Sequence, residues 1–267
     1  MVKGDRKNTI NIITPVGSVD GLFDTLSSVR NVAGLVNSFN FNHILIFNND
    51  CNPEINFEKT NNYQYEICNI NPIASRSIAR NTGLSFITDN PNSFVIFIDS
   101  GDSFLENAVN LVSKIQSEIK TENFMIVGQT YINFSKNINL IRVPLFPITM
   151  QNIVNPFMLG SIILSTKLAK KVSFYEGKKE DWVYWKDILN LKPEIIFINE
   201  VNYVYNVQNV SEHYRKKMLS IFQLRKILID KFKWGKINSL VISFGHIFLI
   251  SCRWIFLRFR YYTGRNV

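Results

Sequence analysis

Two carboxylates follow a run of apolar residues, and two arginines lie one helical turn apart shortly before that run. Asp99 and Asp102 come directly after the apolar stretch 94–98, and Arg76 and Arg80 precede it. An apolar strand that ends in carboxylates is how an α/β fold presents acids at the carboxyl edge of its sheet, where ligands bind. Arginine pairs with phosphate oxygens, and aspartate supplies oxygen ligands to divalent metals. The pattern therefore indicates a site for a substrate that carries a diphosphate.

Each of these features also has a purely structural explanation. The run Asp99-Ser100-Gly101-Asp102 is good turn chemistry, and Asp102 stands where it could cap a following helix. Arg76 and Arg80 could lie on a solvated helix face, where an exposed ion pair contributes at most about 1 kcal/mol. Other parts of the chain must decide between the two explanations.

A second pair of acids, Glu180 and Asp181, stands about 80 residues after the first. The first turn of a helix favours acids, so the pair alone is ambiguous. A carboxylate within hydrogen-bond reach of a hydroxyl group can act as its general base. The neighbouring Trp182 offers an aromatic face on which a sugar ring could stack.

Alternating strands and helices are expected to position these residues. Apolar and β-branched runs predict strands over 9–14, 43–47, 63–70, 93–98, 124–127 and 195–205. Apolar residues at helical spacing predict helices over 22–32, 73–87, 105–119 and about 181–189. Strands that alternate with helices imply a mainly parallel sheet.

Five segments stand in a fixed order along residues 8–205. They are the strand that ends in Thr14-Pro15, the strand followed by Asn48-Asn49-Asp50, the run Ala79-Arg80-Asn81-Thr82-Gly83-Leu84, the run Ile98-Asp99-Ser100-Gly101-Asp102, and Glu180-Asp181-Trp182. Together they resemble glycosyltransferase family two. The resemblance implies the GT-A fold, an α/β architecture with a mainly parallel twisted sheet flanked by helices. It also implies hexosyltransferase-type activity, in which a sugar leaves a nucleoside diphosphate with inversion at the anomeric carbon.

The resemblance assigns roles to individual residues. The nucleotide-sugar donor is expected to lie against Pro15, Asn48, Asn49, Arg80, Asp99 and Asp102. Asp99 and Asp102 match the Asp-x-Asp region, which implies Mn²⁺ or Mg²⁺ as cofactor. The choice of metal ligand between these two acids stays open, with Asp102 favoured. Asp181 matches the acid that deprotonates the acceptor hydroxyl.

The sequence departs from the family pattern at two places. The second strand of the family typically ends in acids, where this chain has Asn48 and Asn49. Asparagine can still accept a hydrogen bond from a uracil or thymine N–H, but without charge. Gly101 stands in the third position of the Asp-x-Asp region, where the family usually has an acid.

Positive charge is concentrated late in the chain. The protein has 267 residues and a formal net charge of +9, and residues 211–267 hold 12 Lys+Arg against 2 Asp+Glu, a net of +10. The apolar run 240–250 is shorter than the ~20 residues that span a bilayer. Residues 253–262 mix cations with aromatic side chains, as segments in a headgroup interface do. We expect a basic amphipathic helical region that binds an anionic membrane surface. Packing on the catalytic domain and nucleic-acid binding are the alternatives, and nucleic acid is not the expected partner because no recognition motif is present.

Cysteine usage and the start of the chain favour a cytoplasmic location. The three cysteines form no C-x-x-C pair, and residues 1–8 are polar rather than signal-like. We therefore expect a protein peripheral on the inner face of the cell membrane. Residues 1–210 would form the catalytic domain, with a donor half over about 8–128 and an acceptor half over 129–210. Residues 211–267 would follow as a C-terminal extension.

These features together predict an inverting glycosyltransferase of bacterial surface polysaccharide assembly. Its acceptor would be a saccharide hydroxyl, with a lipid-linked saccharide favoured by the basic C-terminal region. The rival hypothesis is a catalytically silent GT-A protein that serves as a binding or scaffold subunit of a membrane complex. Asn48, Asn49 and Gly101 favour this rival, because they stand where the family has acids.

Overall fold

The computed structural model describes residues 7–47, 55, 57–70, 74–118, 121–134, 141–143, 155 and 157–207. The chain forms two compact units, Met1–Tyr131 with Phe157–Tyr205, and Ile132–Pro156 with Asn206–Val267. Asn48, Asn49 and the basic region 211–267 lie outside the described residues. None of the described helices has the length and hydropathy that a bilayer-crossing helix requires.

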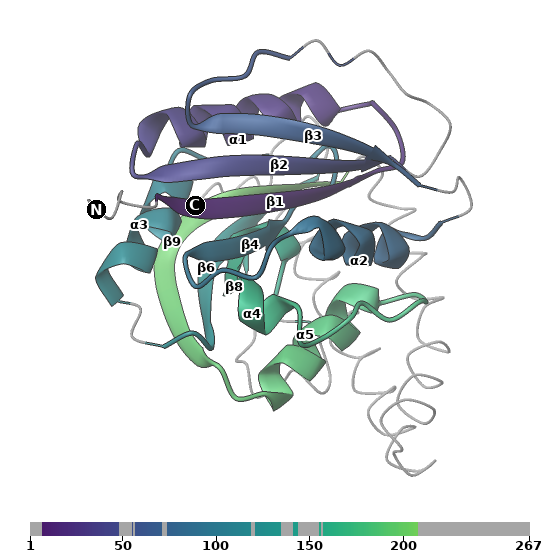
Figure 1. Cartoon of the computed structure of the whole chain (residues 1–267). Helices are drawn as coiled ribbons and strands as arrows, with labels where there is room; N and C mark the ends of the chain where they lie inside the picture. Colours follow the sequence, from purple (N-terminus) through teal and green to yellow (C-terminus); the bar gives the residue numbers. More distant parts are fainter. Residues whose placement is uncertain are drawn as a thin grey trace, which may run out of the picture. The chain divides into compact units, whose positions relative to one another are not determined.

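A mostly parallel sheet forms the centre of the first unit (Figure 1). The strands of the sheet lie in the order β3-β2-β1-β4-β8-β6-β9-β5. β7, which pairs with β6, belongs to the second unit. The strand bounds are β1 Asn8–Val16, β2 Phe39–Phe47, β3 Tyr63–Asn69, β4 Ser93–Phe97, β5 Ser103–Phe104, β6 Phe124–Phe134, β7 Ile141–Val143, β8 Ile162–Ser165 and β9 Glu194–Val207. β1 pairs in parallel with β2 and β4, and β2 pairs in parallel with β3. β8 is antiparallel to both β4 and β6, and β5 is antiparallel to β9. The predicted α/β class with a mainly parallel sheet is thereby confirmed.

Helices pack on both faces of this sheet (Figure 1). They are α1 Leu22–Leu35, α2 Arg76–Phe86, α3 Ala108–Glu118, α4 Thr166–Ala169 and α5 Glu180–Asn190, with a 3-10 turn η2 at Leu159–Ser161. Successive strand residues point to opposite faces, so neighbours in β1 serve different layers. Ile12 joins the core beneath α1 and α3, whereas Ile13 meets Gly83 of α2.

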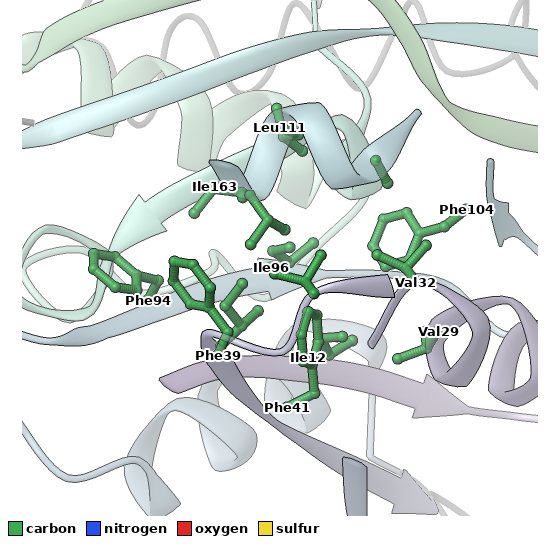
Figure 2. Close-up of a cluster of buried hydrophobic side chains, with 14 of the residues drawn as sticks. Ile12, Val29, Val32, Phe39, Phe41, Phe94, Ile96, Phe104, Leu111 and Ile163 are labelled. Atoms are coloured by element: carbon green, nitrogen blue, oxygen red, sulfur yellow. The ribbon is translucent and has the colours of Figure 1, made fainter. Parts of the chain in front are cut away.

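The core between the sheet and helices α1 and α3 is large and apolar (Figure 2). Strand residues Ile12, Phe94 and Ile96 meet Val32 of α1 and Leu111 of α3 in this cluster. All of these side chains are at most 4% exposed. Full burial of such a side chain contributes about 1.5–3 kcal/mol, so this layer fixes the strand ends that carry the site.

His43 in β2 is a buried polar residue with two partners. Its Nε2 lies 2.8 Å from Thr14 Oγ1, and its Nδ1 lies 3.1 Å from the Tyr63 hydroxyl. Burial disfavours the imidazolium and lowers the pKa of His43 to about 3. The neutral ring therefore belongs to the folded state at every pH above that value.

We expect this histidine to make the fold sensitive to mild acid. The unfolded chain takes up a proton below its ordinary pKa of 6.5, and the folded chain does not until about 3. Stability from neutral His43 is thus fully present above pH 6.5 and is lost as the pH falls toward 3, by up to about 1.4 kcal/mol per unit. Urea unfolding at pH 7, 6 and 5 measures this slope. His43→Gln should flatten it, and an unchanged slope in that variant would contradict the assignment.

Candidate functional site

The turn that follows β4 presents the first pair of acids. Asp102 N–H donates to the Asp99 carbonyl at 3.1 Å and closes the turn. Thr25 of α1 secures it, because its Oγ1 accepts from Gly101 N–H at 3.0 Å and donates to the Asp102 carbonyl at 2.7 Å. Gly101 has φ of 95°, the left-handed region that favours glycine. This backbone geometry favours glycine at position 101 over any residue that carries a side chain.

Gly21 and Gly101 touch backbone to backbone. A Cβ on Gly21 would lie 2.8 Å from Gly101 Cα, and Gly21 has φ of 75°. The atom that this Cβ would meet belongs to the main chain, so no change of side-chain conformation could relieve the clash. The close approach of the start of α1 to the acidic turn therefore requires a glycine at position 21.

We expect Gly21→Ala to lower the free energy of unfolding by at least about 1–3 kcal/mol, from the left-handed backbone alone. Gly34→Ala in the same helix is the matched control, because a Cβ there meets nothing within 4 Å. That change should stabilise the protein by about 0.5–1 kcal/mol. Chemical denaturation of both variants gives the comparison, and similar midpoints would refute it.

Arg80 of α2 joins the two pairs of acids. Its side chain is 1% exposed, and its Nη2 donates to Asp99 Oδ1 at 2.6 Å while its Nη1 donates to Glu180 Oε1 at 3.0 Å. The guanidinium also lies 5.2 Å from the centroid of the Phe174 ring. Arg76, one turn earlier, is 66% exposed and lies 3.6 Å from Asp99 Oδ2. One arginine is thus interior and the other faces solvent.

The two arginines and the acids Asp99 and Glu180 stabilise one another's charged forms. Burial alone disfavours the Arg80 cation, but Asp99 and Glu180 outweigh it and raise the pKa of Arg80. Burial opposes the Asp99 carboxylate, yet Arg80 and Arg76 lower the pKa of Asp99 below its usual value. Asp99 is therefore an anion held between two cations. Its side chain remains 23% exposed.

Asp102 is in a different environment from Asp99. It is 3% exposed, and its Oδ2 accepts a hydrogen bond from the Tyr203 hydroxyl of β9. Burial and the nearby Asp102 carboxylate raise the pKa of Tyr203 well above its ordinary value, so the hydroxyl stays a donor. Gly160 leaves room for the tyrosine ring, because a Cβ there would lie 2.1 Å from Tyr203 Cε2.

The second pair of acids stands at the start of α5. Glu180 and Asp181 occupy its first turn, and Lys179 before them has φ of 62° and makes no side-chain cap hydrogen bond. Burial lowers the pKa of Lys179 to about 8. Asp181 is half-buried. Trp182 is only 3% exposed, so the expected open ring face for sugar stacking was wrong: the indole packs into the interior.

The structure therefore brings together several residues that the sequence singled out. Arg80 contacts Asp99 and Glu180 directly, and electrostatic attraction from Asp181 also contributes to the raised pKa of Arg80. Pro15 lies buried near the end of β1 in register with Ile46 of β2. The placement of Asn48 and Asn49 after β2 is not described.

Two contributors to the site were missed by sequence reasoning. Tyr203 carried no signal beyond its place in a strand, and its role depends on the pairing of β9 with β5. Asn81 lies within the Arg80 run, which predicted no role for it, and it forms hydrogen bonds with Phe174 ahead of α5. Neither contact can be found from local spacing, because each joins segments more than 90 residues apart.

The acids were also expected to hold a metal. Among the described residues, no three or more His, Cys, Asp and Glu side chains are grouped to hold an ion. A metal shared between one carboxylate and substrate phosphates needs no such group. Asp99 suits that arrangement, since its side chain is 23% exposed. Asp102 suits it less, because its carboxylate is buried against Tyr203. The metal ligands stay a prediction.

Comparison with known proteins places the fold. No family model and no curated protein matches the sequence. Residues 1–349 of S. aureus TarS superpose with a TM-score of 0.55 at 13% identity, covering 90% of this chain and 70% of that one. TarS has also been solved with UDP and with UDP-GlcNAc, at TM-scores of 0.54 and 0.55.

A second neighbour comes from Pyrobaculum calidifontis. It is the mannosyltransferase PcManGT in complex with GDP-Man and Mn²⁺, with a TM-score of 0.60 and 10% identity. The match covers 90% of this chain and 70% of the mannosyltransferase chain. Identities this low establish architecture rather than activity. The chain thus has a mixed α/β fold, with a mostly parallel sheet flanked by helices, that it shares with TarS and with this mannosyltransferase.

Proposed function

We propose that the protein is a glycosyltransferase that moves a sugar from a nucleoside-diphosphate donor to a saccharide hydroxyl. The observation that carries the proposal is the convergence on Arg80 of Asp99, just after β4, and Glu180, at the start of α5. Acids at this edge of a parallel sheet lie where α/β folds bind ligands. The bound nucleotide sugars of TarS and PcManGT support the same substrate class.

The donor is proposed to bind beside β1, β2 and β4. Pro15, Asn48 and Asn49 would contact the nucleoside, as the sequence resemblance implies. The diphosphate would lie near Asp99 and the exposed Arg76, which can form charge-assisted hydrogen bonds with phosphate oxygens. Arg80 is 1% exposed and already bonded to two acids, so we assign it an indirect role on the donor side.

Transfer then requires one base opposite the leaving group. We propose that Asp181 takes the proton of the acceptor hydroxyl while that oxygen attacks the anomeric carbon. The bond from the anomeric carbon to the diphosphate breaks, and the nucleoside diphosphate leaves with the electron pair. Attack from the side opposite the leaving group inverts the anomeric configuration.

A divalent metal is proposed as the cofactor. Mn²⁺ or Mg²⁺ would be held by Asp99 or Asp102 together with the donor diphosphate, and it would offset the charge that develops on the leaving group. Support comes from the Asp99 side chain, which is 23% exposed, and from the Mn²⁺ bound in PcManGT.

The acceptor and cellular setting rest on the sequence alone. The net charge of +10 over residues 211–267 favours an anionic membrane surface, and a lipid-linked saccharide is the acceptor that such a location supplies. We propose a peripheral enzyme on the inner face of the cell membrane that takes part in surface polysaccharide assembly.

A panel of nucleotide sugars tests the proposal. UDP-, GDP- and dTDP-linked hexoses are screened by thermal shift, because a ligand at 100 times its Kd adds about 2.7 kcal/mol of stability. Hydrolysis of the bound donor is then measured with Mn²⁺ and with EDTA. Stabilisation with turnover supports the enzyme, and stabilisation without turnover favours the silent scaffold. No stabilisation by any donor would refute the proposal.

A further inference from the structure

One face of α2 holds the chain that leads into α5. Ser77, Arg80 and Asn81 are three and four residues apart and therefore share a helix face. All three contact the segment 174–180, about 100 residues later in the chain. Two of them, Arg80 and Asn81, belong to the run by which the sequence resembles glycosyltransferases.

Backbone contacts account for most of this attachment. Asn81 Nδ2 donates to the Phe174 carbonyl at 3.0 Å, and Phe174 N–H donates to Asn81 Oδ1 at 2.8 Å. The amide thus pairs with a main-chain donor and acceptor as a neighbouring strand would. Ser77 Oγ donates to the Tyr175 carbonyl at 2.8 Å.

Aromatic packing fixes the same segment from other sides. Phe174 stacks on Tyr184 of α5 with ring centroids 3.9 Å apart, and it meets Phe97 of β4 edge-on at 4.9 Å. The Arg80 guanidinium lies 5.2 Å from the Phe174 ring. Phe174 therefore packs among α2, β4 and α5 at the point where the acids converge.

The start of α5 depends on this attachment. Lys179 precedes the helix in a left-handed conformation without a side-chain cap hydrogen bond. A helix start without a cap forgoes a contact that typically contributes about 1 kcal/mol. The bond from Arg80 to Glu180 fixes the first turn instead, one residue before Asp181.

We propose that Ser77, Arg80 and Asn81, here named the α2 clamp, are positioning residues that set Asp181 relative to the donor edge. This inference rests on the proposed function, because it assigns the clamp to the proposed base. Within the clamp, the Arg80 guanidinium joins Asp99 to Glu180 in the first turn of α5. One side chain thus connects the donor edge to the helix that carries the proposed base. A misplacement of about 1 Å at a reacting group can cost 10²-fold in rate.

The test uses Asn81→Ala in the full-length protein, with Ser85→Ala as matched control. Ser85 lies on the same helix, and its hydroxyl donates to the Thr82 carbonyl within α2 at 2.7 Å. Transfer is measured well below the melting temperature, so that all variants are folded. We expect kcat of Asn81→Ala to fall about 10- to 100-fold, with the Kd for the nucleoside diphosphate within twofold of wild type. Ser85→Ala should match wild type in both quantities.

Hydrogen exchange over residues 174–186 provides a readout that needs no activity. Asn81→Ala should raise exchange in this segment at least tenfold, and Ser85→Ala should not. If Asn81→Ala fails to fold, Ser77→Ala replaces it, since that change removes one contact and keeps the other three.

The outcomes separate the two proposals. An unchanged kcat in a clamp variant that melts earlier would overturn the positioning role and leave a purely structural one. Unchanged exchange would overturn the clamp itself. Absence of transfer by wild type with every donor would refute the proposed function, and exchange would still decide whether α2 fixes the start of α5.

Discussion

Replacement of Asp181 by asparagine is expected to lower sugar transfer by about 10²–10⁴-fold. Loss of a general base has this magnitude, because the acceptor hydroxyl must then lose its proton without help. Donor binding should change little, since the donor is proposed to contact β1, β2 and β4 rather than α5. Asparagine keeps the size and hydrogen-bonding capacity of the side chain, so the fold should persist.

The measurement separates kcat from donor affinity. Transfer is followed with the donor that the wild type uses, and the Kd for the nucleoside diphosphate is obtained by titration. Asp187→Asn is the control, because it makes the same chemical change on α5 almost two turns away from the helix start. A Kd increase with intact kcat in Asp181→Asn would contradict the assignment, as would equal losses in both variants.

The fold could be predicted largely because buried strands and helices leave recognisable patterns of apolar residues in the sequence. The run 94–98 has no polar residue, and the corresponding β4 residues are buried on both faces between β1 and β8. The predicted runs at 9–14 and 43–47 correspond likewise to β1 and β2, although these strands extend further. What could not be predicted is the insertion of β8 next to β4. Its apolar sequence fits a parallel or an antiparallel neighbour equally well.

The site could be predicted in its residue types but not in its contacts. An arginine in a helical segment is typical of an exposed surface. The burial of Arg80 depends on its ion pairs with Asp99 and Glu180, which lie 19 and 100 residues away in the sequence. For Trp182 the expectation was exposure, and the structure shows burial. A residue in the first turn of a helix can face solvent or core, and here packing placed the indole inside.

Asn81 shows the same limitation from a different direction. Polar residues in the middle of a helix usually face water, and nothing in the local spacing distinguishes this one. Its partners are main-chain atoms of Phe174, which leave no mark on the sequence because every residue has them. Such contacts can be found only from coordinates.

Removal of Arg80 is expected to have the largest effect on stability. Arg80→Met keeps the length of the side chain but leaves Asp99 and Glu180 without their shared cation. Removing one partner of a buried ion pair typically costs about 3–5 kcal/mol. The acids here are 23% and 16% exposed, so the lower end of that range is the expectation. Arg30→Met is the control, because Arg30 pairs at 3.3 Å with the 81% exposed Glu58 and should lose less than about 1 kcal/mol.

The pH dependence of this loss identifies its electrostatic origin. Arg80 lowers the pKa of Asp99 below its ordinary 3.8, so the stability that the pair contributes is present above that pH and disappears as the folded-state pKa is crossed from above. The deficit of Arg80→Met should therefore be full at pH 7 and should shrink below about pH 4, because a protonated Asp99 no longer needs a cation. Urea midpoints of wild type and Arg80→Met between pH 7 and pH 3 measure it. A deficit that stays constant over this range would mean that Arg80 stabilises the fold by packing on Phe174 rather than by charge.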